Sequence, residues 1–202
     1  MMQQLAIDYV GTEYGGFPVC MNMIHDGDVI YDFGVGEDIS FLEGVLSQKN
    51  CHGHLFDFTP QSIEWFKENH ADKTNMTYHE YGISVEDGEL ACHPPQSGIS
   101  RRPAWMGFEH KETHPVKTLK TIMSELGHDH IDVLKVDIEG EEYKVIPQML
   151  EDDIFPKQIC LEYHNRWLGS KGHLHDDLIN LLVIDYTLVC LVHGTEALWV
   201  RK

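Results

Sequence analysis

The chain has 202 residues, of which 42% are hydrophobic and 24% are charged, as in an ordinary soluble globular domain. Its 33 acidic and 15 basic side chains give a formal net charge of −18. Such a charge repels phosphate backbones and anionic lipids, which argues against nucleic acid and membranes as partners. The length predicts one domain over residues 1–202, with residues 1–27 as a lead-in segment.

The cysteines and the first residues indicate a compartment. The five cysteines are scattered and no two form a Cys-x-x-Cys pair, which favours reduced thiols over a disulfide scaffold. The first four residues, Met-Met-Gln-Gln, are not a basic segment followed by an apolar one, so we expect no signal peptide. The most apolar stretch, residues 178–192, is too short and too polar to span a bilayer. We therefore expect a cytoplasmic protein.

Strand-like and helix-like segments alternate along the chain from residue 29. The first half is predicted to contain strand 29–35, helix 39–48, strand 53–58, helix 60–69, strand 76–84 and a hairpin over 85–93. Residues 94–113 show no periodicity and are predicted to form a long loop over the active site. The second half is predicted to contain helix 116–126, strand 131–138, helix 141–150, strand 158–164, helix 174–184 and the strand pair 186–193 and 197–201.

This alternation predicts an α/β fold. Repeated strand–helix units favour a Rossmann-like three-layer sandwich, in which helices cover both faces of a mostly parallel sheet. The closing strand pair predicts one antiparallel strand at an edge of that sheet.

A glycine-containing turn follows the first strand. Residues 29–41 read strand–Asp-x-Gly-x-Gly–helix, with Asp32, Gly34 and Gly36 at the junction. Glycine lets the backbone approach a nucleotide-like cofactor, because it has no Cβ to block the approach. The next residues, Glu37 and Asp38, repel the pyrophosphate of a dinucleotide. S-adenosylmethionine has no phosphate and carries a sulfonium and an ammonium, so the acidic turn favours this cofactor over NAD.

Candidate ligand-binding residues also lie at the ends of later strands, where open α/β sheets bind small molecules. Asp57 ends the second strand at the spacing from which an acid holds ribose hydroxyls. Ile83 ends the third strand and suits an apolar contact with adenine. Asp137 and Glu139 share one face of the fourth strand, where two carboxylates are costly to bury unless they are paired or functional. Taken singly, Asp32 or Asp57 is more often an acid of a turn, a cap or the surface, but their position at successive strand ends favours a site.

The chain has 14 histidines, but their positions argue against a zinc site. His52, His54, His128 and His130 fall at strand starts, opposite the predicted site, and no zinc-type Cys/His spacing occurs. Structural or surface roles are favoured for most of them. His164 is the exception, because it ends the fifth strand, where a neutral imidazole can act as a base near pH 7.

Four segments together resemble a known family. They are residues 29–36, 55–60, 81–88 and 131–142, the last with a Lys-x-Asp-x-Glu-Gly-x-Glu pattern. This set resembles the FkbM-like branch of class I S-adenosylmethionine-dependent methyltransferases. The resemblance implies a seven-stranded Rossmann-like fold and, usually, methylation of a hydroxyl on a sugar or other small metabolite. The chain departs from the pattern at Asp38, which replaces the third loop glycine, and at Asp57, where a Glu is common.

The favoured mechanism is transfer of the sulfonium methyl to an acceptor oxygen. Gly34 and Gly36 would admit the cofactor, Asp32 would lie near its amino-acid end, Asp57 would bind the ribose, and Phe58 and Ile83 would flank adenine. His164 is the first candidate for the base that deprotonates the hydroxyl and Asp137 the second. In the loop, Arg101, Arg102 and Trp105 would cover or select the small-molecule acceptor.

Three alternatives stay open. Asp137, Glu139, Glu162 and His164 would together suit a divalent cation such as Mg²⁺. The chain would otherwise be a cofactor-binding module without turnover, or an NAD-dependent oxidoreductase. The sequence predicts neither the acceptor nor an oligomeric state.

Overall fold

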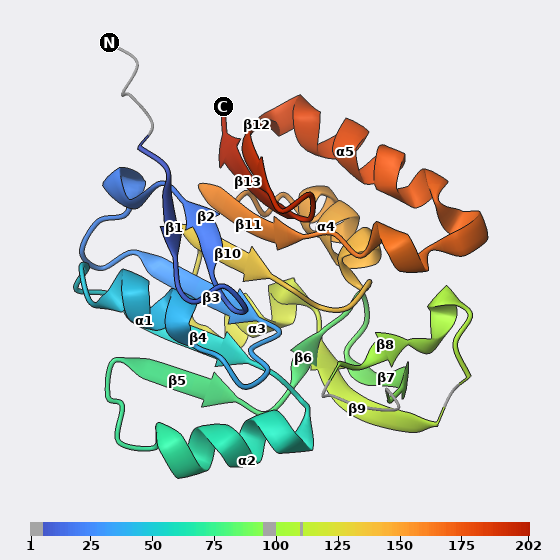
Figure 1. Cartoon of the computed structure of the whole chain (residues 1–202), viewed down its shortest axis with the longest axis horizontal. Coiled ribbons are helices and arrows are strands. Elements are labelled where there is room, and N and C mark those ends of the chain that lie inside the picture. Colours follow the sequence, from blue (N-terminus) through green and yellow to red (C-terminus); the bar gives the residue numbers. More distant parts are fainter. Residues whose placement is uncertain (1–5, 95–99, 110) are drawn as a thin grey trace.

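Figure 1 shows the computed structural model, which describes residues 6–94, 100–109 and 111–202. Its large sheet consists of β3 (Val29–Phe33), β4 (His52–Phe56), β5 (Met76–His79), β10 (Val133–Val136), β11 (Gln158–Glu162), β12 (Tyr186–Val192) and β13 (Glu196–Arg201). Across the sheet the strands lie in the order β12-β13-β11-β10-β3-β4-β5. The chain extends from β3 to β5 and then returns to the other side of β3 with β10, so the strand order reverses between β3 and β10.

Five neighbouring strands of the large sheet, β11, β10, β3, β4 and β5, are parallel to one another. The strand β13 is antiparallel to both of its neighbours. The predicted α/β class, with a mostly parallel seven-stranded sheet, is confirmed. The antiparallel strand was expected at the edge, but it lies one position inside, between β11 and β12. Burial explains this placement, because residues 197–200 of β13 are buried whereas β12 exposes Leu188 and Leu191.

Helices cover both faces of the large sheet, as the three-layer prediction requires (Figure 1). They are α1 (Ser40–Leu46), α2 (Pro60–Asn69), α3 (Leu119–Leu126), α4 (Glu142–Glu151) and α5 (His173–Asp185). One face packs against α3, α4 and α5, where Ile146 and Leu182 are fully buried. The other face packs against α1 and α2, through residues such as Leu42 and Phe66.

The strands between the two helical layers are apolar on both faces. In β10, Leu134 and Val136 belong to one core and Val133 to the other, because successive side chains of a strand point to opposite faces. Apart from Asp32 and Lys135, β3 and β10 read as continuous apolar runs, which is why the sequence located both strands.

A smaller sheet lies beyond the carboxyl end of β5 (Figure 1). Its strands are β6 (Gly82–Ile83), β7 (Gly88–His93), β8 (Arg102–Pro103) and β9 (Glu112–Lys117), in the order β6-β9-β7-β8. Residues 85–93 are therefore not the predicted hairpin, because β7 pairs with β9 and β8 instead of folding back on itself. The strand predicted over 76–84 is likewise divided between β5 and β6, which lie in different sheets.

The predicted loop and the following helix also differ from expectation. Within 94–113, residues 95–99 and 110 lie outside the described residues, and the rest includes β8 and the start of β9. The helix predicted from residue 116 begins only at Leu119, because Lys117 still pairs with β6 and the side chain of Thr118 accepts a hydrogen bond from the Thr121 amide. Gly127 ends this helix in the left-handed conformation, as predicted.

The remaining elements are short. An N-terminal pair of strands, β1 (Asp8–Val10) and β2 (Phe17–Val19), is antiparallel. Single 3₁₀ turns span Met21–Met23, Ala104–Met106, Asn165–Trp167 and Gly169–Lys171. None of the helices in the described ranges is both long and apolar enough to cross a bilayer.

Candidate active site

The turn after β3 is built around Gly34. Its φ is +80°, and a Cβ placed there would lie 1.6 Å from the backbone oxygen of Asp137. The Gly34 amide donates to the oxygen of Phe56 at 3.0 Å. Glycine is therefore required at this position, both for its φ and for the close approach of the turn to the segment that follows β10.

Asp57 joins the ends of β3 and β4. One oxygen of its carboxylate accepts the amide of Gly36 at 2.9 Å, and the other accepts the amide of Thr59 at 2.7 Å. Asp57 is buried, so these hydrogen bonds hold its carboxylate in one orientation. The acid that the sequence assigned to a ribose is thus fixed beside the glycine turn.

A pocket of about 800 Å³, partly open to solvent, lies where the strand order reverses. Of the eight residues predicted to bind the cofactor or to act as the base, six line it: Gly34, Gly36, Asp57, Phe58, Ile83 and Asp137. Asp32 and His164 do not. The lining also includes residues that the sequence did not assign to a site, namely Tyr14, Gly15, Lys135 and Glu141.

Asp32 lies beneath the turn and is 1% exposed. Its carboxylate pairs with the ammonium of Lys135 at 3.0 Å, and Lys135 donates a second bond to the backbone oxygen of Gly34 at 2.8 Å. Asp32 therefore acts on the pocket through Lys135, which lines it, and supports the turn from below.

Asp38 connects the turn to the N-terminal segment. Its carboxylate accepts the amide of Ser40, the first residue of α1, at 2.7 Å, and it accepts the hydroxyl of Thr12. Burial raises the pKa of Asp38, but these hydrogen bonds outweigh it and lower the pKa below its usual value. The Asp38 side chain also contacts Gly15, where a Cβ would lie only 2.5 Å from it. The acid in place of the third glycine thus anchors Gly15 and Tyr14 at the pocket.

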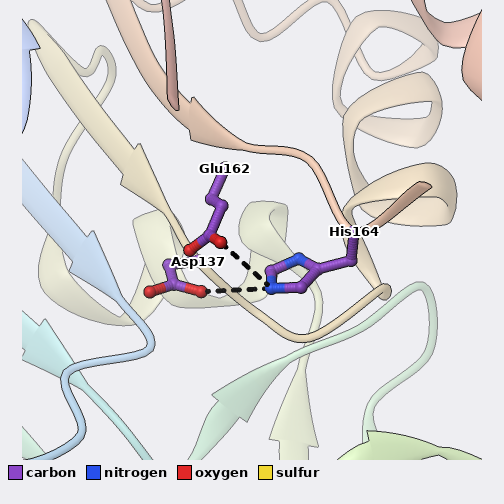
Figure 2. A group of neighbouring side chains, drawn as sticks. All are labelled: Asp137, Glu162 and His164. Atoms are coloured by element: carbon purple, nitrogen blue, oxygen red, sulfur yellow. Dashed lines mark ion pairs between the residues drawn. The ribbon is translucent and has the colours of Figure 1, made fainter. Parts of the chain in front are cut away.

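Four charged or ionisable side chains converge where β10 and β11 end, and we call Asp137, Glu139, Glu162 and His164 the carboxylate–histidine cluster. Figure 2 shows Asp137 and Glu162 with their carboxylates directed at the His164 ring. The Nε2 atom of His164 lies 3.6 Å from an oxygen of Asp137 and 3.7 Å from oxygens of Glu139 and Glu162. The sequence predicted these four residues as a group, and the structure brings them together. Asp137 and Glu139 line the pocket.

Glu142, in the first turn of α4, holds His164 in place. One of its oxygens accepts the Nδ1 proton and the backbone amide of His164, both at 3.0 Å. The other accepts the amide of Gly140 at 2.8 Å. This role of Glu142 could not be predicted, because nothing in the local sequence pattern shows that it contacts a residue 22 positions away.

The cluster contains more negative charge than one imidazole balances. Burial lowers the pKa of His164, but Glu142, Asp137 and Glu162 outweigh it and raise the pKa to about 9. Burial and repulsion by Asp137 raise the pKa of Glu162 to about 8. Burial also raises the pKa of Glu139. This end of the pocket therefore favours cations.

The segment predicted to select the acceptor is only partly at the pocket. Arg101 lines it and is held by Glu112 at 2.5 Å and by the side-chain oxygen of Gln61 at 3.1 Å. The guanidinium of Arg102 lies over the ring of Trp167, 4.4 Å from its centroid. Trp105 donates its indole N–H to Glu141 and is not among the lining residues.

Known proteins resemble this chain in sequence. Residues 25–190 match the family described as the methyltransferase FkbM domain. The human protein described as probable methyltransferase-like protein 24 is 28% identical over 142 residues, a match that covers 69% of this chain and 33% of the human one. The rat protein of the same description is 26% identical over 144 residues, a match that covers 69% of this chain and 34% of the rat one. The chain thus spans about a third of the length of these curated relatives.

Solved structures share the fold. The crystal structure of the methyltransferase FkbM from Methylobacillus flagellatus KT matches with a TM-score of 0.58 and 16% identity, over 88% of this chain and 44% of that one. A chain from the crystal structure of a fibrillarin/Nop5p complex matches with a TM-score of 0.53 and 12% identity, over 88% of this chain and 73% of that one. At these identities the likeness concerns the fold alone. Because the family match extends over most of the sequence, the chain belongs to the FkbM family of methyltransferases.

Proposed function

We propose that this chain binds S-adenosylmethionine in the pocket at the strand reversal and transfers its methyl group to a hydroxyl oxygen of a small molecule. The observation that carries the proposal is the arrangement of Gly34, Gly36 and Asp57. This arrangement supports a nucleoside site, because the glycine turn admits the cofactor backbone while the fixed carboxylate faces the ribose hydroxyls. Phe58 and Ile83, which also line the pocket, supply the apolar contacts for adenine.

The charge of the pocket supports a cationic cofactor. Its lining includes two cationic side chains and five acidic ones, so the acids are in excess. The cations are Lys135 and Arg101, and the acids are Asp38, Asp57, Asp137, Glu139 and Glu141. A sulfonium and an ammonium are attracted by such a site, whereas the pyrophosphate of NAD is repelled.

Methyl transfer depends mainly on alignment, because the sulfonium already carries the driving force. The acceptor oxygen attacks the methyl carbon in line with the carbon–sulfur bond, which breaks to release S-adenosylhomocysteine. The hydroxyl proton passes to a carboxylate of the cluster. Asp137 and Glu139 are placed for this step because both line the pocket, whereas His164 lies behind them with its Nδ1 bonded to Glu142. We therefore assign His164 a positioning role.

Calorimetric titration with S-adenosylhomocysteine tests the cofactor assignment, with NAD as the control ligand. We expect micromolar binding of the former alone. In Asp57→Asn the affinity should fall about 10- to 100-fold, because a charge-assisted hydrogen bond contributes about 1.5–3 kcal/mol and each tenfold is about 1.4 kcal/mol.

Asp28→Asn is the matched control for that variant. Asp28 also accepts a backbone amide, that of His25 at 2.9 Å, but it lies at the amino end of β3, away from the pocket. Its variant should bind within about twofold of the wild type. Thermal unfolding of both variants checks that they are folded. Unchanged binding by folded Asp57→Asn, or a preference for NAD, would contradict the proposal.

A further inference from the structure

Three members of the carboxylate–histidine cluster have the geometry of a metal site. Asp137 follows β10, whereas Glu162 ends the neighbouring parallel strand β11 and His164 follows two residues later. One ligand atom from each of the three lies within 4.8 Å of the other two (Figure 2). Atoms bound to one ion at about 2.0–2.2 Å are separated by roughly 3–4.4 Å. The distances of 3.6 and 3.7 Å from His164 Nε2 to the two carboxylates fall in that range.

The orientation of His164 is an independent indication of a ligand. Its side chain is 2% exposed, and its Nδ1 is bonded to Glu142 at 3.0 Å. Since Glu142 accepts the Nδ1 proton, Nε2 is directed into the cluster. The carboxylates around Nε2 lie 3.6 or 3.7 Å from it, beyond hydrogen-bond distance. A metal ion bound there would take the place of the proton that Nε2 carries without it. A carboxylate that orients a histidine through its other nitrogen is the usual support of a metal-binding imidazole.

We propose that Asp137, Glu162 and His164 bind one divalent transition-metal ion at the wall of the pocket. Imidazole as one of three ligands favours ions such as Mn²⁺, Fe²⁺, Co²⁺ or Zn²⁺ over Mg²⁺ and Ca²⁺, which prefer oxygen alone. The structure thus refines the sequence-based suggestion of Mg²⁺. Three protein ligands leave positions open for other oxygens, as in catalytic metal sites.

The consequence for catalysis rests on the function proposed above. Asp137 lines the pocket, so an ion bound to it would lie at the pocket wall, within reach of an acceptor. An acceptor hydroxyl bound there becomes more acidic, and its proton passes to Glu139, which lines the pocket beside Asp137. The oxygen then forms its bond to the methyl carbon while the carbon–sulfur bond breaks, and the sulfur leaves with that electron pair as neutral S-adenosylhomocysteine.

Titration of the whole, metal-stripped chain with Mn²⁺ tests the proposal, with free Mn²⁺ followed by electron paramagnetic resonance and no cofactor present. We expect one ion per chain, bound at least tenfold more tightly than Mg²⁺ measured by competition. Glu162→Gln and Asp137→Asn each remove one anionic ligand and should weaken binding at least tenfold. Glu142→Gln removes the support of His164 and should weaken it by about 10- to 100-fold.

Asp129→Asn is the matched control, because Asp129 lies 2.6 Å from His130 in a carboxylate–imidazole pair outside the cluster and is 96% exposed. It should bind Mn²⁺ as the wild type does. Thermal unfolding without metal shows whether each variant is folded. Glu162→Gln should disturb the fold less than Glu142→Gln, because the Glu162 side chain is partly exposed whereas that of Glu142 is fully buried. The proposal is overturned if the wild type binds no Mn²⁺ at millimolar concentration, or if folded Glu162→Gln binds it as tightly as Asp129→Asn.

This outcome is separable from that of the cofactor proposal. Titration of metal-free protein with S-adenosylhomocysteine reports on the nucleoside half of the pocket alone. A chain that binds the nucleoside but no ion retains the methyltransferase proposal and loses the metal site. A chain that binds the ion but not the nucleoside retains the metal site and loses the methyltransferase proposal.

Discussion

The two ends of the parallel strands each have a hollow and a group of titratable side chains, but the two groups are constructed differently. The hollow at the amino end is lined by His52, His54 and His128, and the hollow at the carboxyl end is the pocket beside the glycine turn. At the amino end His54 bonds to His79 at 3.1 Å, and His128 bonds to the hydroxyl of Tyr31 at 2.7 Å. These polar atoms are partnered by one another.

At the carboxyl end, the fold fixes charged side chains at the pocket and in the cluster beside it. Asp57 and Asp137 line the pocket, and Nε2 of His164 faces carboxylates. Neither a hollow nor a group of histidines therefore identifies a site by itself. The carboxyl end differs because its fixed carboxylates line the pocket, whereas the amino-end histidines are bonded to one another or to Tyr31.

The largest difference in unfolding free energy is expected between variants of the two glycines that flank β3. Gly34 and Gly27 have similar positive φ values, +80° and +88°, but a Cβ at Gly34 would meet the Asp137 backbone, whereas nothing lies within 4 Å of one at Gly27. Gly27→Ala should cost about 1–2 kcal/mol of unfolding free energy from φ alone. Gly34→Ala should add a clash beyond the usual 1–3 kcal/mol of overpacking, enough to prevent stable folding at a typical stability of about 5–15 kcal/mol.

Urea unfolding of both variants measures this difference. Because the two glycines share the same backbone strain, Gly27→Ala isolates the contribution of the close approach. Equal losses in the two variants would mean that the turn can move away from β10, and that the carboxyl end is less rigid than the contact implies.

The sequence predicted the carboxyl end of the large sheet because the features there are local. An apolar run ending in Asp-x-Gly-x-Gly or in Asp-x-Glu-Gly fixes both a strand and the point at which it ends. Parallel strands then bring those points to one edge, which placed Asp57, Asp137 and His164 near one another without any knowledge of their contacts.

What the sequence did not predict depends on pairing between distant segments. The strand β7 joins β9 through partners such as Gly88 and Val116, and a short strand has no local pattern that specifies a partner so far away. The role of Glu142 and the position of Tyr14 at the pocket are missed for the same reason. Lys135 was read as part of a motif, but its ion pair with Asp32 required the register of β10 against β3.

A second prediction compares a buried lysine with an exposed one. The Lys135 ammonium and its partner Asp32 are both almost fully buried, whereas Lys67 and its partner Glu80 are 61% and 52% exposed. Removing one member of a buried pair leaves an uncompensated charge and costs about 3–5 kcal/mol. Lys135→Met should therefore lose that much unfolding free energy, and Lys67→Met about 1 kcal/mol or less.

The double variant Asp32→Asn/Lys135→Met tests the stated cause. Without either charge, no buried ion lacks its partner, so the double variant should unfold at higher urea than Lys135→Met alone. If the double variant is less stable than the single one, the loss comes from packing of the lysine chain and its bond to Gly34, and the charge argument fails.

The smallest expected effect concerns the histidines of the amino end and their response to acid. Burial, with smaller contributions from neighbouring charges, lowers the pKa of His54 to about 3 and that of His79 to about 4. An unfolded histidine titrates near 6.5, so between pH 6.5 and about 4 the unfolded chain binds protons that the folded chain does not. These two residues therefore destabilise the fold as the pH falls through that window, and this loss is absent at pH 7.5.

The variant His54→Gln/His79→Gln removes that titration, so its unfolding free energy should decrease less between pH 7.5 and pH 5.0 than that of the wild type. Both rings are partly solvated, which limits the expected difference to the order of 1 kcal/mol. His173→Gln, which removes an exposed imidazole from α5, should follow the wild type. If the double variant and the wild type lose equal stability, the fold does not hold these histidines neutral. Their mutual hydrogen bonds would then not prevent their protonation.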